Sequence, residues 1–136
     1  MVGQGIKKQK PNLKTISIKG KSDRITFSFD HLEDFSYTDA QRDGTFFITM
    51  LQRFSKLCTL GWTEIAKAQR HSFGFETMLV SSLSASAKSR MKRYPDIVKL
   101  FVFRATGDNH VFLGYREENV FNIIFIEHSF GDVYQH

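Results

Sequence analysis

Three runs of strand-forming residues near the C-terminus constrain the fold of this chain most. Residues 99–106, 110–116 and 120–127 are rich in Val, Ile, Leu and Phe. Only three residues join each run to the next, Gly107-Asp108-Asn109 and Glu117-Glu118-Asn119. Connections this short force neighbouring strands to run antiparallel. The sequence therefore predicts a three-stranded antiparallel meander.

A shorter strand pattern lies near the N-terminus. Residues 15–18 alternate with period two, a Gly-Lys-Ser-Asp turn follows, and Ile25, Phe27 and Phe29 alternate again. This pattern predicts an N-terminal β-hairpin. Residues 1–14 carry four lysines and no apolar run, so we expect a flexible basic arm. Residues 15–136 have the length of a single domain.

The segment between the hairpin and the meander has helical periodicity. Thr38 and Gln41 have capping-box spacing. The apolar residues that follow fall on one helical face: Phe47, Met50, Leu51, Phe54, Leu57 and Cys58. Cys58 is therefore expected to lie in the core rather than to act as a nucleophile. A second helix is expected over residues 62–70, with Trp62, Ile65 and Ala66 inward.

The order of these elements predicts the fold class. Two strands, then two or three helices, then three strands indicate an α+β fold with the helices packed on one face of the sheet. The 14 phenylalanines supply large apolar areas for its core.

Basic residues form two clusters in a chain of net charge +5. The first lies within residues 1–24. The second consists of Lys88, Arg90, Lys92 and Arg93, with Lys99 beyond. Residues 81–89 (SSLSASAKS) are small and polar and predict a loop. The loop and its basic continuation are a candidate nucleic-acid contact arm. The alternative is that these charges only keep a Phe-rich chain soluble.

Alternation along the meander allows an inference about a binding face. If the strands pair symmetrically across both turns, residues of equal parity share a face. The face formed by odd-numbered residues is almost wholly apolar, and we expect the helices to pack on it. The even face carries Arg104, His110, Arg116, Asn122 and His128 among apolar residues. It is a candidate polyanion cradle, with Gly114 leaving space for a ligand backbone. The alternative is a sheet whose outer face is simply polar at its ends.

The last nine residues concentrate groups that can move protons, His128, Asp132, Tyr134 and His136. Beside a phosphate-binding arginine pair, the histidines and the tyrosine could act as base and acid for RNA cleavage by the 2′-hydroxyl. His128, Asp132 and His136 could instead ligate a metal, although their spacing matches no strong metal motif. A third interpretation is a tail that docks through Phe130 and Tyr134.

Other motifs do not appear in the chain. It lacks GxGxxG, GxxxxGK[ST], CxxC and GxSxG, so we expect neither a nucleotide cofactor nor a resident metal. No run approaches the length of a membrane helix. The single cysteine cannot form an internal disulfide, which favours a cytoplasmic location.

The layout resembles that of the small bacterial mRNA interferase toxins of the RelE/ParE superfamily. The residues that carry the resemblance are Phe103-Arg104, Gly114-Tyr115-Arg116, the apolar strand 120–126 and the terminal Asp132-Val133-Tyr134-Gln135-His136. It covers roughly residues 40–136, and its motifs are short. The extra N-terminal hairpin and the basic loop at 81–93 depart from the family layout. The resemblance implies helices packed on an antiparallel sheet, basic strand residues on the RNA phosphate and a C-terminal Tyr or His that assists cleavage.

Two classes of function follow. The first is an RNA-directed endoribonuclease of toxin type, in which Arg104 and Arg116 hold the scissile phosphate and His128 or His136 transfers protons. Tyr134 would stack or assist. The second is a non-catalytic module that binds nucleic acid or protein. Its partners would be RNA, an antitoxin-like protein or a second copy of the chain, reached through strand edges.

Overall fold

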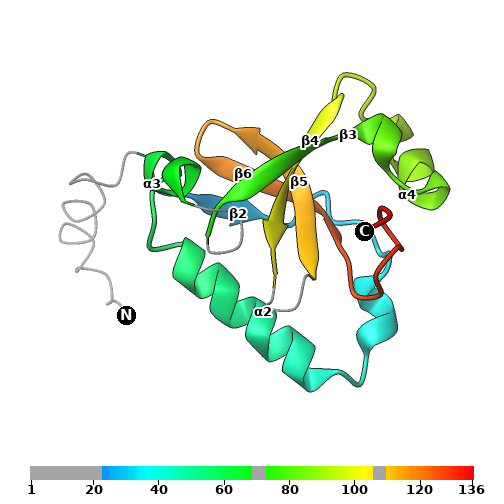
Figure 1. The fold of residues 1–136 in the computed structure, drawn as a ribbon, viewed down its shortest axis with the longest axis horizontal. Coiled ribbons are helices and arrows are strands. Elements are labelled where there is room, and N and C mark those ends of the chain that lie inside the picture. The colour runs from blue at the N-terminus through cyan, green and yellow to red at the C-terminus, as the bar shows by residue number, and fades with distance from the viewer. Residues whose placement is uncertain (1–22, 69–72, 106–109) are drawn as a thin grey trace, which may run out of the picture.

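The computed structural model describes residues 23–68, 73–105 and 110–136, which form an α+β fold around one mixed sheet (Figure 1). The sheet has five strands in the order β2-β6-β5-β4-β3. Their bounds are β2 Thr26–Ser28, β3 Phe75–Leu79, β4 Lys99–Arg104, β5 Val111–Glu117 and β6 Val120–Ile126. The helices are α2 Gly44–Leu57, α3 Trp62–Lys67 and α4 Ala85–Arg90. None of the helices in the described ranges is long and apolar enough to cross a membrane.

The predicted meander is confirmed. Strands β4, β5 and β6 are successive antiparallel neighbours. A fourth strand, β3, extends the sheet by pairing antiparallel with β4. No strand was predicted for these five residues from the sequence. Phe75, an aromatic residue at the start of a short alternating run, was the signal for this strand in the sequence. In the structure it pairs with Phe103 of β4.

Only part of the expected N-terminal hairpin can be compared with the structure. Residues 15–18 and the predicted arm, residues 1–14, lie outside the described residues. The second predicted strand is present as β2, and it pairs in parallel with β6. The backbone N–H of Thr26 donates to the carbonyl of Asn119 at 3.0 Å, which joins β2 to the start of β6.

Helix α2 begins later than the capping-box spacing predicted. Thr38 lies in a separate 3₁₀ turn, and Asp43 caps α2 by accepting the backbone N–H of Phe46 at 3.0 Å. The buried face consists of Phe46, Met50, Phe54 and Leu57. Leu51 is 62% exposed and Cys58 is also exposed, so their predicted burial is wrong. Apolar residues cover more than one face of this helix, and packing against the sheet selects the face that begins at Phe46.

The short helix predicted after α2 is present, but it covers Trp62–Lys67 and not the whole of residues 62–70. Helix α3 buries Trp62 and Ile65, but Ala66 is exposed, against the prediction. The indole N–H of Trp62 donates to the carbonyl of Asn119 at 2.9 Å and ties α3 to the turn between β5 and β6.

The predicted loop at residues 81–89 is wrong. A 3₁₀ turn covers Val80–Ser82, α4 follows, and a second 3₁₀ turn covers Met91–Arg93. The Ser84 hydroxyl caps α4 by accepting the N–H of Ala87 at 3.2 Å. Leu83, Ala87 and Met91 recur every four residues and are all buried. Small polar residues thus form the exposed side of a short amphipathic helix.

Helices cover both faces of the sheet rather than the one face predicted. Helices α2 and α3 pack on a cluster that includes Phe103, Phe112 and Phe121. Helix α4 packs on the opposite face, against Leu100, Val102 and Leu113. Alternate residues of β4 therefore contact different helices. This arrangement buries the central strands on both sides, in accord with their nearly continuous apolar sequence.

The prediction that residues of equal parity share one face of the meander is also wrong. Phe103 pairs with Phe112, so odd residues of β4 share a face with even residues of β5. Strands β5 and β6 are joined by a tight turn in which Glu118 has a φ of 55°. Their pairing then shifts by one residue between Leu113 and Gly114. A one-residue shift moves every following side chain to the other face.

Gly114 lies at this shift and leaves no space for a ligand. A Cβ atom at this position would clash with the carbonyl oxygen of Asn122 on β6. The backbone that approaches Gly114 is therefore that of the neighbouring strand.

Candidate active site

A pocket of about 250 Å³ brings together three of the predicted catalytic residues, Arg104, Tyr134 and His136. Arg104 comes from the end of β4, whereas Tyr134 and His136 come from the C-terminal tail. Glu76 of β3 also lines the pocket, together with Val102, Phe103, Val111 and Gln135. Three sheet strands, β3, β4 and β5, and the tail that follows β6 therefore supply its walls.

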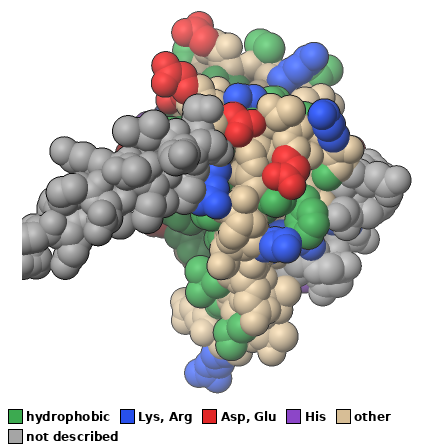
Figure 2. Space-filling view, turned by 90° about the vertical axis from the view of Figure 1, so that its left-hand side faces the viewer, with side chains coloured by type: hydrophobic (Ala, Val, Ile, Leu, Met, Phe, Trp, Pro, Cys, Tyr) green, Lys and Arg blue, Asp and Glu red, His purple; other side chains and the backbone are tan. Residues whose placement is uncertain are grey.

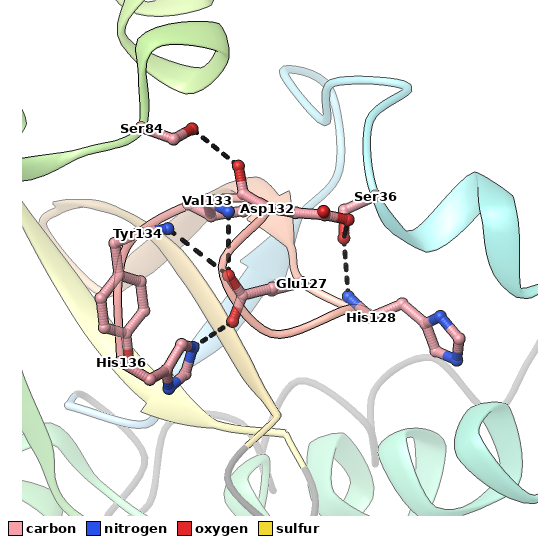
Figure 3. A network of polar contacts seen from close by, with 8 residues as sticks. All are labelled: Ser36, Ser84, Glu127, His128, Asp132, Val133, Tyr134 and His136. Atoms are coloured by element: carbon pink, nitrogen blue, oxygen red, sulfur yellow. Dashed lines mark hydrogen bonds and ion pairs between the residues drawn. The ribbon is translucent and has the colours of Figure 1, made fainter.

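The tail is held in place by contacts to α4 and its N-terminal turn (Figure 3). The Ser84 hydroxyl donates to the carbonyl of Asp132 at 2.7 Å, and the Ser84 N–H donates to the carbonyl of Val133 at 2.7 Å. The hydroxyl of Ser36 donates to the Asp132 carboxylate at 2.7 Å. Val133 is fully buried in the second core cluster. The tail docks through the buried Val133 and the partly buried Tyr134, which the docking interpretation named, whereas Phe130, which it also named, is 55% exposed.

Glu127 is a buried ionisable residue that contacts His136 and that was not among the residues predicted from the sequence. Its side chain is fully buried, and its carboxylate accepts the backbone N–H groups of Val133 at 2.9 Å and Tyr134 at 3.4 Å. The same carboxylate is bonded to Nε2 of His136 (Figure 3). A buried carboxylate requires such donors. The available signal was an acidic residue directly after the apolar run of β6.

The Glu127–His136 pair resembles the arrangement that orients catalytic imidazoles. A carboxylate bonded to one imidazole nitrogen fixes the ring orientation and the tautomer, and directs the other nitrogen elsewhere. The His136 ring also stacks on Tyr134, with centroids 4.2 Å apart and planes inclined by 25°. His136 is thus positioned by two neighbours at the wall of the pocket.

His128, the other predicted proton-transfer residue, is directed away from this pocket (Figure 3). Its Nε2 lies 2.9 Å from the Asp43 carboxylate, and its ring packs edge-on against Phe46. His110 lies beside it, with ring centroids 5.8 Å apart. His128 therefore links the end of β6 to the N-terminus of α2. The three residues considered as metal ligands do not converge, and no group of three or more His, Cys, Asp or Glu within the described ranges could hold a metal ion.

The contact between Asp43 and His128 leads to a pH prediction. The hydrogen bond from His128, followed by that from the N–H of Phe46, lowers the pKa of Asp43 below its ordinary value. A carboxyl group with a lowered pKa in the folded state stabilises the fold above its unfolded pKa, and this contribution is lost as the pH falls through the folded value. We expect Asp43→Asn, which retains a capping side chain, to be less stable than the parent at neutral pH.

The difference should shrink as the pH falls below about 4 and should disappear only once the pH lies below the lowered pKa of Asp43. Urea midpoints of the two proteins, measured from pH 7 downward, test this expectation. A difference that does not change with pH would mean that the substitution acts through packing and not through charge.

The predicted arginine pair is divided between the two faces of the sheet. Arg104 pairs with Val111 in register, whereas Arg116 pairs with Phe121. Five residues of β5 separate the two positions, about 17 Å at 3.4 Å per residue. The Arg116 guanidinium lies over the Trp62 ring at 4.3 Å, and its Nε donates to the carbonyl of Glu118. The two arginines cannot hold one phosphate together.

Several residues predicted to contact nucleic acid have partners within the protein. Arg90 and Arg93 bind opposite oxygens of the buried Glu33 carboxylate, at 3.1 and 3.2 Å. Asn122 is buried and donates to Glu117 at 3.3 Å. Lys88 and Lys92 are exposed on and after α4. On the face shown in Figure 2, basic and acidic side chains are interspersed.

Among the described residues that line the pocket, Arg104 is the one Lys or Arg, and Arg53 of α2 lies outside that lining. Desolvation lowers the pKa of Arg53, and the charge of Arg104 lowers it further. The two guanidinium groups are therefore close enough to repel one another.

Comparison with protein-family models, curated proteins and solved structures finds no match to this chain.

Proposed function

We propose that the protein is an RNA-directed endoribonuclease of toxin type that acts at the pocket of Arg104, Tyr134 and His136. The observation that carries the proposal is the convergence of these three side chains in one pocket, with the buried Glu127 carboxylate bonded to His136. They combine an anion-binding group, a hydroxyl and an oriented imidazole. These are the groups that metal-independent cleavage of RNA requires.

The proposed reaction is transesterification by the 2′-hydroxyl. His136 removes the proton from this hydroxyl, and the 2′-oxygen attacks the adjacent phosphorus. The bond from phosphorus to the 5′-oxygen breaks, and the products are a 2′,3′-cyclic phosphate and a free 5′-hydroxyl. Tyr134 supplies the proton to the leaving 5′-oxygen. The Arg104 guanidinium binds the phosphate oxygens, on which negative charge develops.

Glu127 is proposed as a positioning residue because it acts through His136. Its burial and its three hydrogen-bond donors hold the carboxylate in place. DNA lacks the 2′-hydroxyl nucleophile, so the proposal requires activity on RNA alone. It also includes a cytoplasmic location, where RNA is accessible, and a neutralising protein partner, as the resemblance to interferase toxins implies.

Paired arginine substitutions test the location of the site. Arg104→Ala should remove a charged hydrogen bond to phosphate worth about 1.5–3 kcal/mol, which lowers the cleavage rate by about 10- to 150-fold. Arg116→Ala should retain the parent rate, because Arg116 lies on the other face of the sheet. Cleavage of a labelled oligoribonucleotide gives the rates, and melting temperatures establish that both variants fold.

Two outcomes would overturn this assignment. Loss of activity in Arg116→Ala alone would move the site to the α3 face. A parent protein that binds RNA with steep salt dependence but forms no product would favour the non-catalytic binding module.

A further inference from the structure

A row of aromatic rings in successive contact extends from the pocket. The Phe130 ring lies 5.1 Å from the His136 ring and 4.9 Å from the His110 ring, measured between centroids. Tyr134 continues the row beyond His136, and His128 continues it beyond His110. The row therefore begins in the wall of the proposed active site.

Of the phenylalanine and tyrosine rings in this row, Phe130 is the exposed one. It is 55% exposed, although a phenylalanine ring is among the costliest groups to leave in water. Phe130 does not anchor the tail to the core, because the buried Val133 does so. Core packing therefore does not explain why a phenylalanine stands at this position. Because the Phe130 ring contacts His136, which lines the pocket, it is available to a ligand bound there.

The turn that carries Phe130 is held on both sides. Before it, the His128 N–H donates to the Ser36 hydroxyl at 2.8 Å. After it, the same hydroxyl donates to the Asp132 carboxylate, and the Asp132 N–H donates to the carbonyl of Ser129 at 3.1 Å. Gly131 has a φ of 95°, which a residue with a side chain rarely adopts, and this allows the tight turn. A ring presented by a fixed turn binds without a large ordering cost.

We propose that Phe130 is a stacking platform for a nucleobase of single-stranded RNA, next to the phosphate held by Arg104. The inference deepens the proposed function and rests on it. His136 is the connection, since it lines the phosphate pocket and contacts the Phe130 ring. Proteins that bind single strands place aromatic rings beside basic groups, because every base has a face that stacks. The platform should therefore bind any of the four bases, and it should not bind a backbone that lacks bases.

Binding of a non-cleavable probe tests the platform separately from catalysis. The probe is a fluorescent, fully 2′-O-methylated oligonucleotide of mixed sequence, and its partner is an abasic backbone of equal length. Phe130→Ala should weaken binding of the base-containing probe by about 5- to 150-fold. It should leave binding of the abasic probe unchanged. Phe130→Trp should restore the affinity, because a larger ring stacks at least as well.

Phe29→Ala is the matched control. Phe29 is 50% exposed and contacts Phe54, away from the pocket, so its removal should leave both affinities at the parent value. Phe130→Leu serves as a second variant if Phe130→Ala does not fold, since it retains an apolar side chain without a stacking face.

The outcomes separate the platform from the nuclease. Base-dependent binding that requires Phe130, in a protein that cleaves no RNA, would support the platform and overturn the nuclease. Cleavage and probe binding that are both unchanged in Phe130→Ala would overturn the platform and retain the nuclease. Equal loss of base-containing and abasic binding would also overturn the platform, because the effect would then lie in the backbone contact.

Discussion

Replacing Gly114 with Ala is expected to destabilise the protein by about 3 kcal/mol or more, the largest effect that we expect of any single methyl group added to this fold. The new Cβ atom would clash with the carbonyl oxygen of Asn122, and its next contacts are the Asn122 carbonyl carbon and the Cα atom of Ile123. All three are backbone atoms of β6, which cannot rotate away as a side chain can. Relief of the clash therefore requires separation of β5 from β6 at the centre of the sheet.

Gly44→Ala is the matched control for this substitution. Gly44 is the first residue of α2, and a Cβ atom there would meet no atom within 4 Å. Because Ala restricts the unfolded chain more than Gly does, this variant should be neutral or more stable by about 0.4–1 kcal/mol. Urea unfolding followed by far-UV circular dichroism measures both variants. A Gly114→Ala protein as stable as the parent would mean that the pairing shift at this position is not part of the fold.

Replacing His136 with Ala should lower the rate of RNA cleavage by about 10²–10⁴-fold, the range typical for loss of a general base. The imidazole lines the pocket and is oriented by the buried Glu127 carboxylate. Alanine retains neither the proton acceptor nor the ring that stacks on Tyr134. Single-turnover cleavage with the enzyme in excess isolates the chemical step from product release.

His31→Ala is the control for the loss of an imidazole. His31 contacts Tyr94 and Tyr115 and does not line the pocket, so its variant should cleave at the parent rate. A His136→Ala variant that keeps the parent rate would exclude the proposed base. A fall in rate that is accompanied by a large fall in melting temperature would assign His136 to tail docking through Glu127, and Glu127→Gln would then show the same loss of stability.

The three C-terminal strands and the α+β class could be predicted from the sequence, because both depend on local signals. Alternation specifies a strand, and a connection of two or three residues requires an antiparallel neighbour. Residue chemistry also identified Arg104, Tyr134 and His136 as candidates before their positions were known. These properties belong to short segments and do not depend on what packs against them.

Tertiary structure alone decided which residues share a site. The parity of the meander depends on the register of β4 with β5, on a tight turn at Glu118 and on a shift beside Gly114, where the backbone of Asn122 approaches closely. The choice of the Phe46 face of α2 and the burial of Glu127 likewise depend on residues distant in sequence. A shift of one residue in the pairing of two strands moves each side chain to the opposite face of the sheet. Even when the bounds of every strand are predicted correctly, the residues that share a site are therefore still undetermined.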